Sequence, residues 1–199
     1  YDLSAFGGVL PDGYSYSEYA RQGFFELCGV AVLDLMVIFL AGVLAKRNEN
    51  GRKPVAVRIY SAVFSLITIL LICSAMSKMI MYIGEYGLTG LRFYTSWFMI
   101  LLGIVFLVLI LHEIFPGMKT VATLFISFTV MLGVLCFCDP DARIAQYNVE
   151  SYLSGEIAET DTGSLAMLSE GAAPYVERLK DSDSAYYNCC NRVLITMKE

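Results

Sequence analysis

Apolar residues gather in four long runs, Gly23–Ala45, Val55–Met76, Phe93–Leu111 and Val121–Cys138. Each run holds 18 or more residues, and a helix needs about 20 apolar residues to cross a hydrocarbon core roughly 30 Å thick. Surface helices of soluble domains show water a polar face, which these runs lack. The pattern therefore predicts four transmembrane helices and an all-α, polytopic membrane protein.

The residues after the fourth run are polar and carry helix signals but no strict strand alternation. Asp139 or Asp141 is suited to cap the first helix, and Pro174 suits a first helical turn. The predicted tail helices run to Leu153, over 174–180 and over 184–198. The chain then divides into an N-terminal segment (1–22), a four-helix transmembrane domain (23–138) and a small helical tail (139–199).

The stretch between the second and third runs loses its apolar character near Ser74. It holds Gly84, Gly87 and Gly90, and each glycine weakens a helix by about 1 kcal/mol relative to alanine. We therefore expect residues 74–94 to form the turn between these two spans.

Charge is divided unevenly along the chain. Residues 1–138 carry 9 Lys or Arg against 8 Asp or Glu, a formal +1, and residues 139–199 carry 5 against 11, a formal −6; together they give the net −5. A nucleic-acid-binding surface would be basic, so we expect no nucleic-acid partner. The expected partners are the lipid bilayer and a protein that contacts the acidic tail.

The basic residues of the short loops predict the orientation. The loop after the first run carries Lys46, Arg47, Arg52 and Lys53, which predicts that it is cytoplasmic. Arg58, just inside the second run, is expected to reach back to the headgroups. An even number of spans then places both ends outside, in the plasma membrane. The start at Tyr1, without Met or a secretory signal, suggests a fragment with further spans upstream.

Asp34 lies ten residues after Phe24, which places it about 15 Å deep at 1.5 Å per residue. An ionised Asp there costs about 2.5–3.5 kcal/mol, so we expect it to be protonated, paired or facing water. One interpretation is an intramembrane ion or proton site. The other is a neutral packing residue that is hydrogen-bonded to Ser65, Thr68 or Ser74.

Four charged residues, Glu26, Lys78, Glu85 and Arg92, are predicted to lie at the outer ends of their segments. Two acids and two bases at one depth would form an ion-paired cluster that joins the first three spans. The alternative is an anionic-substrate site that uses Arg92.

The six cysteines do not form a metal-binding pattern, because the chain has one histidine, His112, and no paired C-x-x-C. Cys189 and Cys190 in the tail are either free thiols or disulfide partners of Cys136 or Cys138. His112-Glu113 lacks the second histidine of H-E-x-x-H, and no G-x-S-x-G occurs. We therefore expect no metal, no cofactor and no hydrolytic chemistry.

Three stretches, Tyr19–Leu27, Tyr86–Tyr94 and Ala142–Glu150, together resemble a family of bacterial, mostly Gram-positive, polytopic membrane proteins catalogued as a domain of unknown function. The tail from Leu165 to Leu179 also resembles that family, although Gly171 stands where the family pattern has an aspartate. The resemblance implies additional N-terminal spans and a cell-envelope location. It implies no reaction.

Three functions remain open on these residues. The first is a non-enzymatic envelope scaffold or sensor whose outside tail binds a partner, since no catalytic set is present. The second is an ion- or proton-coupled transporter that uses Asp34. The third is an outer-face membrane enzyme that acts on lipid or cell-wall precursors through Glu26, Glu85 and Arg92.

Overall fold

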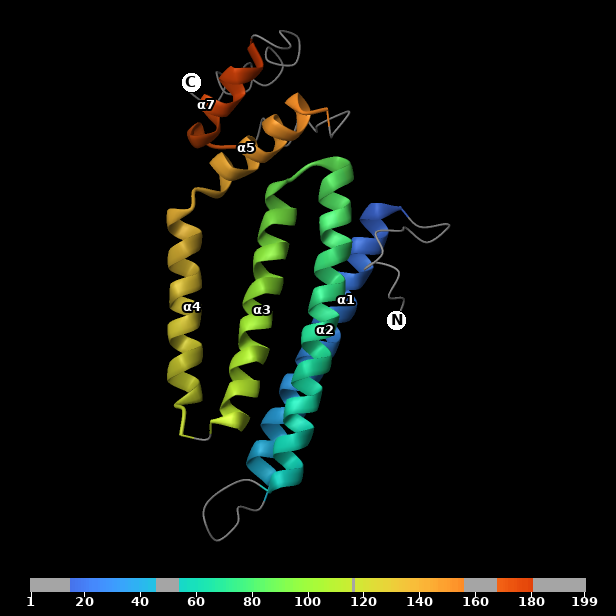
Figure 1. The fold of residues 1–199 in the computed structure, drawn as a ribbon, viewed down its shortest axis with the longest axis vertical. Helices are drawn as coiled ribbons and strands as arrows, with labels where there is room; N and C mark the ends of the chain where they lie inside the picture. The colour runs from blue at the N-terminus through green and yellow to red at the C-terminus, as the bar shows by residue number, and fades with distance from the viewer. Residues whose placement is uncertain (1–14, 46–53, 116, 156–167, 181–199) are drawn as a thin grey trace. The chain divides into compact units, whose positions relative to one another are not determined.

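The computed structural model describes residues 15–45, 54–115, 117–155 and 168–180, and these residues contain helices and no strand. Four of the helices are long and apolar enough to cross a membrane. They are α1 (Tyr16–Leu44), α2 (Val55–Tyr86), α3 (Gly90–Ile114) and α4 (Thr120–Phe137), shown in Figure 1. The predicted all-α fold and the multi-pass membrane class are confirmed.

α1 begins seven residues before the predicted start of the first span, at Tyr16 instead of Gly23. A capping box fixes this start: the Ser15 hydroxyl accepts a hydrogen bond from the backbone N–H of Glu18 at 3.3 Å, and the Glu18 carboxylate accepts from the Ser15 N–H at 3.5 Å. Tyr19 and Ala20 are already buried. Packing of this first turn extends the helix beyond its apolar run.

α1 and α2 form an antiparallel pair (Figure 1). The buried positions on each helix recur at intervals of three and four residues, which is the spacing of one helical face. On α1 they are Ala20, Gly23, Leu27, Ala31, Asp34 and Ile38, and on α2 they include Ser61, Ser65, Thr68, Ile72 and Ala75. Many of these side chains are small, a composition common where transmembrane helices pack together.

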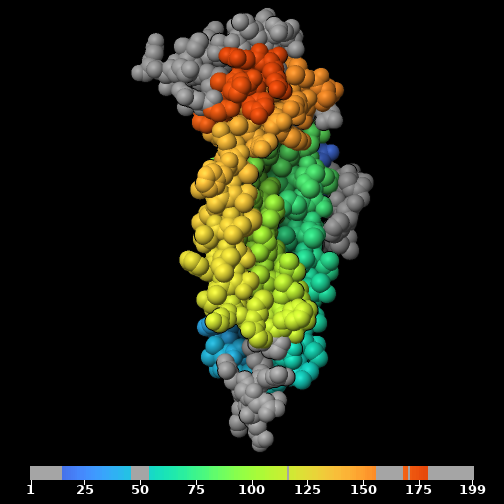
Figure 2. All heavy atoms as spheres, turned by 60° about the vertical axis from the view of Figure 1, so that its left-hand side comes forward, coloured from blue at the N-terminus to red at the C-terminus, as the bar shows by residue number. Residues whose placement is uncertain are grey.

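α3 packs on this pair through Met99, Leu102 and Phe106, which are buried. None of the α4 side chains is buried. Figure 2 shows α4 beside α3, with its side chains on the surface of this face. Because the α4 surface is apolar, it is suited to face lipid tails.

The turn between α2 and α3 is much shorter than predicted. α2 continues through Ser74 and Gly84 to Tyr86, and only residues 87–89 lie outside a helix. Gly87 has a φ of 76°, the left-handed conformation that ends many helices and that glycine adopts without a Cβ penalty. The prediction was wrong because Ile72, Ala75 and Met79 continue the buried face of α2, and this packing offsets the low helix propensity.

The tail contains α5 (Pro140–Leu153), η2 (Glu170–Ala172), α7 (Ala173–Val176) and η3 (Glu177–Lys180). Asp139 caps α5, as one of the two expected caps, and Pro140 occupies its first turn. Residues 174–180 are helical but divide between α7 and the 3₁₀ turn η3. The predicted helix over 184–198 and most of the linker before Leu168 lie outside the described residues.

The tail has a hydrophobic core of its own, formed by Ile144, Ala145, Leu168, Ala172 and Val176, with Leu88 and Phe93 packed against it. Tyr147 of α5 is 38% exposed. The buried face of α5 is centred on Ile144 and Val149 and includes Asn148, so it is rotated away from Tyr147.

The chain forms two compact units. We call Tyr1–Lys78 with Phe98–Met131 the membrane unit, and Met79–Trp97 with Leu132–Glu199 the tail unit. The tail unit therefore includes the last part of α2, the first part of α3 and the end of α4. A division at residue 138 follows the hydropathy pattern, whereas these units follow the packing.

Candidate functional site: polar contacts of the membrane helices and the tail

Asp34 of α1 is buried and contacts Thr68 of α2, whose hydroxyl lies within hydrogen-bond distance of Asp34 Oδ2. Thr68 is one of the three partners that the sequence suggested. The same hydroxyl lies 3.0 Å from the backbone carbonyl oxygen of Phe64. Ser65, one turn away on α2, is fully buried, and its Oγ has no hydrogen-bond partner among the described residues. These four residues place a small polar region between the two helices.

A pocket of about 90 Å³ lies between α1 and α2. Its lining includes Ile38 and Ser61, one helical turn from Asp34 and from Ser65 respectively. Asp34 is not among the lining residues.

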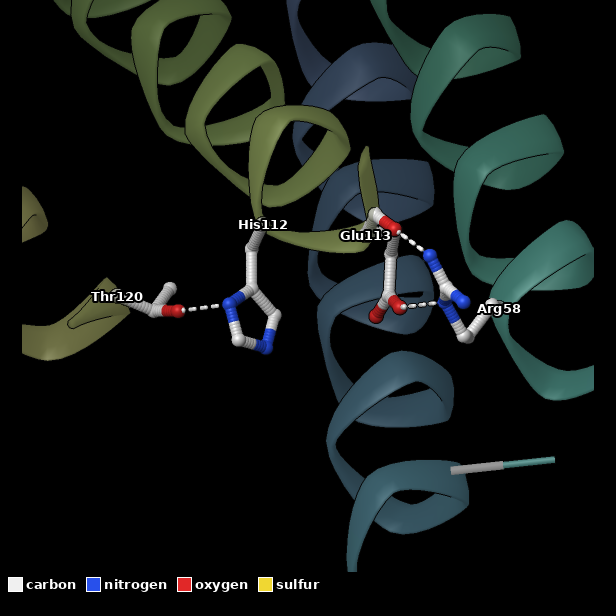
Figure 3. Close-up of polar contacts among 4 residues, drawn as sticks. All are labelled: Arg58, His112, Glu113 and Thr120. Atoms are coloured by element: carbon white, nitrogen blue, oxygen red, sulfur yellow. Dashed lines mark hydrogen bonds and ion pairs between the residues drawn. The ribbon is translucent and has the colours of Figure 1, made fainter. Parts of the chain in front are cut away.

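Arg58 and Glu113 form an ion pair between α2 and α3 (Figure 3). Arg58 Nε lies 3.7 Å from Glu113 Oε2, and an Nη of Arg58 donates to the backbone carbonyl oxygen of Glu113. The Glu113 side chain is buried and that of Arg58 is about one-third exposed. The guanidinium therefore binds a carboxylate and one backbone carbonyl near the end of α3, and the extension of Arg58 to the headgroups stays a prediction. The sequence signal was an acid and a base at the ends of two adjacent spans.

His112 and Thr120 connect α3 to α4, with 2.6 Å between His112 Nδ1 and Thr120 Oγ1 (Figure 3). Thr120 is the first residue of α4. This contact holds the start of a helix that has no buried side chain.

Lys78 lies over the ring of Tyr19, with Nζ 4.1 Å from the ring centroid, in a cation–π contact between α2 and α1. Lys78 is buried. A Cβ placed at Gly23 would lie 2.9 Å from Lys78 Cδ, so the glycine gives the lysine stem its space. Lys78 thus contributes packing as well as charge.

The other three members of the predicted charge cluster lie as follows. Glu26 is exposed and accepts a hydrogen bond of 2.8 Å from Gln22 on its own helix. Glu85 is exposed, and together with Arg92 it belongs to the tail unit. Arg92 stacks 3.9 Å from the Tyr82 ring centroid and donates to the carbonyl oxygens of Tyr86 and Gly87. Arg92 therefore satisfies the carbonyls that the end of α2 leaves unpaired.

Asn148 of α5 binds the backbone of the turn between α2 and α3. Its Nδ2 donates to the Leu88 carbonyl oxygen at 2.7 Å, and its Oδ1 accepts from the Leu88 N–H at 2.7 Å. Asn148 is buried. The pairing satisfies both backbone groups of a residue that lies outside any helix, as buried polar groups require. Asn148 was not predicted as a site residue, since nothing in its spacing distinguishes it from a solvated asparagine.

The family model described as Domain of unknown function (DUF4153) matches residues 3–179 of the chain. The chain belongs to this family. No curated protein and no solved structure shows a significant match to the chain. The DUF4153 match confirms the resemblance to a family catalogued as a domain of unknown function, and the family description assigns no reaction.

Each stretch that carries the DUF4153 resemblance contributes one of the contacts above. The first stretch contains Tyr19 and Gly23, which lie against Lys78. The second stretch contains Leu88 and Arg92, and the third contains Asn148. At Gly171, where this chain departs from the expected aspartate, a Cβ would lie 2.5 Å from Asp139 Oδ2. A side chain at this position would displace the carboxylate that caps α5.

Cys136 is exposed and Cys138 is half-buried, and both are free thiols. Cys189 and Cys190, their proposed partners, lie outside the described residues. Among the described residues, no group of three His, Cys, Asp or Glu side chains could hold a metal ion.

Proposed function

We propose that this DUF4153 protein is a non-enzymatic membrane scaffold or sensor whose tail binds a protein partner. The observation that carries the proposal is the pairing of Asn148 with Leu88, supported by the common core of α5, η2 and α7. The tail is bound to the turn that joins two membrane helices, so it is not a free linker. A partner that moved α5 would also act on the ends of α2 and α3.

The proposed orientation places Tyr1 and the tail outside the cytoplasm. Lys46, Arg47, Arg52 and Lys53 support it, because lysine and arginine in short loops favour the cytoplasmic side. Arg58 is paired with Glu113. Acidic residues have little effect on orientation, so this ion pair does not alter the proposed orientation.

The alternative of an outer-face enzyme has less support. Glu26 bonds to Gln22, and Arg92 binds the backbone at the end of α2. Both side chains therefore have structural contacts within the protein, and neither contact requires a bound substrate. The transporter alternative retains Asp34 as a buried carboxyl that faces a neighbouring helix.

Site-directed photocrosslinking in intact cells tests the scaffold or sensor function. The reagent replaces Tyr147 or Leu153, both exposed on α5, and the control position is Phe128 on the apolar surface of α4. We expect a protein adduct of one discrete mass at the tail positions and none of that mass at Phe128. Absence of a discrete adduct at both tail positions would contradict a protein-binding tail.

A further inference from the structure

The Asp34 carboxyl has no basic side chain close to it along α2. Arg58 and Lys78 each lie ten residues from Thr68, or about 15 Å along the helix. Arg58 is paired with Glu113, and Lys78 lies over Tyr19. Neither is therefore placed to neutralise an Asp34 carboxylate by direct contact.

The remaining ionisable groups of the membrane helices are also separated from Asp34. On α1 the nearest ionisable residues are Cys28 and Glu26, six and eight residues before Asp34. On α2 the nearest ionisable residue is Cys73, five residues after Thr68. On α3 they are His112 and Glu113, and Glu113 is held at the level of Arg58. The α4 segment of the membrane unit, 120–131, has no ionisable side chain.

Thr68 can satisfy Asp34 in either protonation state, because a hydroxyl is both a donor and an acceptor. With a charged carboxylate, the hydroxyl donates its one proton to Asp34 Oδ2. With a neutral carboxyl, Asp34 donates to Thr68, and the hydroxyl proton turns to the Phe64 carbonyl oxygen 3.0 Å away. Rotation of one hydroxyl therefore exchanges the two arrangements, and no helix has to move.

The fully buried Ser65 hydroxyl, without a partner and three residues from Thr68, supplies a second independent observation. A buried hydroxyl that is left unpaired costs about 1–3 kcal/mol. It is a polar group available to a ligand or a proton carrier at this depth.

We propose that Asp34 and Thr68 form a reversible proton-binding site inside the membrane-spanning bundle, with Ser65 as its neighbouring polar group. The ligand is a proton, which is bound by the carboxylate and released from the carboxylic acid without a change in any other bond. This site goes beyond the proposed scaffold or sensor function and does not depend on a tail partner.

Infrared spectroscopy of the full chain in phosphatidylcholine vesicles tests the proposal. The C=O stretch of a protonated carboxyl group is recorded from about pH 3 to about pH 11, a range that includes the ordinary pKa values of Asp and of Lys. The spectrum of Asp34→Asn is subtracted, since this variant keeps the volume and removes the titrating group. If the variant does not fold, aspartate labelled with ¹³C at the side-chain carboxyl identifies the same band through its isotope shift.

We expect a band that is present at low pH, disappears as the pH rises within this range and is absent from Asp34→Asn. A band that persists across the whole range would show a permanently neutral packing residue, and no band at any pH would show a permanently ionised one. Either result overturns the proposal.

Thr68 variants separate a positioning role from a purely structural one. Thr68→Val removes the hydroxyl at nearly constant shape, and Thr68→Ser retains it. Because charge-assisted hydrogen bonds are about twice as strong as neutral ones, Thr68→Val should destabilise the carboxylate more than the acid. The band should then titrate at a higher pH in Thr68→Val and near the wild-type pH in Thr68→Ser. Equal titration in all three proteins would remove Thr68 from the site.

Discussion

Arg58 and Glu113 show how a single polar contact can join two membrane helices. Glu113 is buried, and Arg58 binds both its carboxylate and its backbone carbonyl. Such a pair contributes through the cost of leaving one partner unpaired. Glu26, by contrast, is exposed and bonds to Gln22 on its own helix.

Glu113→Gln should therefore lower the stability of the protein by about 1–3 kcal/mol, the cost of an unsatisfied charged donor. The matched control is Glu26→Gln, the same chemical change at an exposed position, which should alter stability by less than about 0.5 kcal/mol. Thermal unfolding in detergent measures both. Equal losses would contradict this difference and would favour the predicted charge cluster around Glu26.

α5 is the element whose packing decides how the tail is held. Its buried face supplies Ile144 and Ala145 to the tail core and Asn148 to the turn at Leu88. α4 is the opposite case, with no buried side chain and a polar contact between Thr120 and His112 at its start. The two helices follow each other in sequence but differ in what stabilises them.

Asn148→Asp should loosen α5 from the turn, because it keeps the acceptor for the Leu88 N–H but replaces the donor with an oxygen that faces the Leu88 carbonyl. Loss of one buried hydrogen bond with an unsatisfied acceptor costs about 1–3 kcal/mol. Hydrogen exchange should become faster at the Leu88 amide and in residues 144–149.

Gln146→Glu is the control for this prediction, since it makes the same amide-to-acid change on the same helix. Gln146 donates to Glu150 at 3.0 Å on the exposed side, and a like-charged pair there costs only about 0.2–0.5 kcal/mol. If the two variants exchange equally fast, the pairing of Asn148 with Leu88 does not hold the tail.

At the scale of the whole molecule, the described residues contain four helices that could cross a membrane and a packed helical tail. Its orientation rests on the distribution of lysine and arginine in the loops. The contacts within the membrane unit and within the tail unit would be the same in either orientation, so only a test across the membrane decides it.

Cysteine labelling in intact cells measures the orientation, in a chain whose six native cysteines are replaced by alanine. A cysteine at Asn48, in the basic loop, should stay hidden from a membrane-impermeant thiol reagent, and one at Ser164, in the tail, should react. Labelling after permeabilisation controls for reactivity. The reverse pattern would place the tail in the cytoplasm and remove the proposed extracytoplasmic partner.

The sequence by itself determined the membrane class, the four spans found among the described residues and the helical character of the tail where the structure describes it. A run of about 20 apolar residues has few other stable structures, since a spanning backbone must satisfy its own hydrogen bonds. The capping residue Asp139 was also readable, because capping depends on residues only a few positions apart.

Only the tertiary structure decided which polar residues meet. The contacts between Asp34 and Thr68, Arg58 and Glu113, and Leu88 and Asn148 join residues 34, 55 and 60 positions apart. The length of the turn after α2 was decided in the same way, because burial of Met79 and the binding of Arg92 to the end of α2 outweighed the helix-weakening effect of Gly84. Local propensity is a weak preference of about 1 kcal/mol per residue, and the packing of a neighbouring helix readily exceeds it.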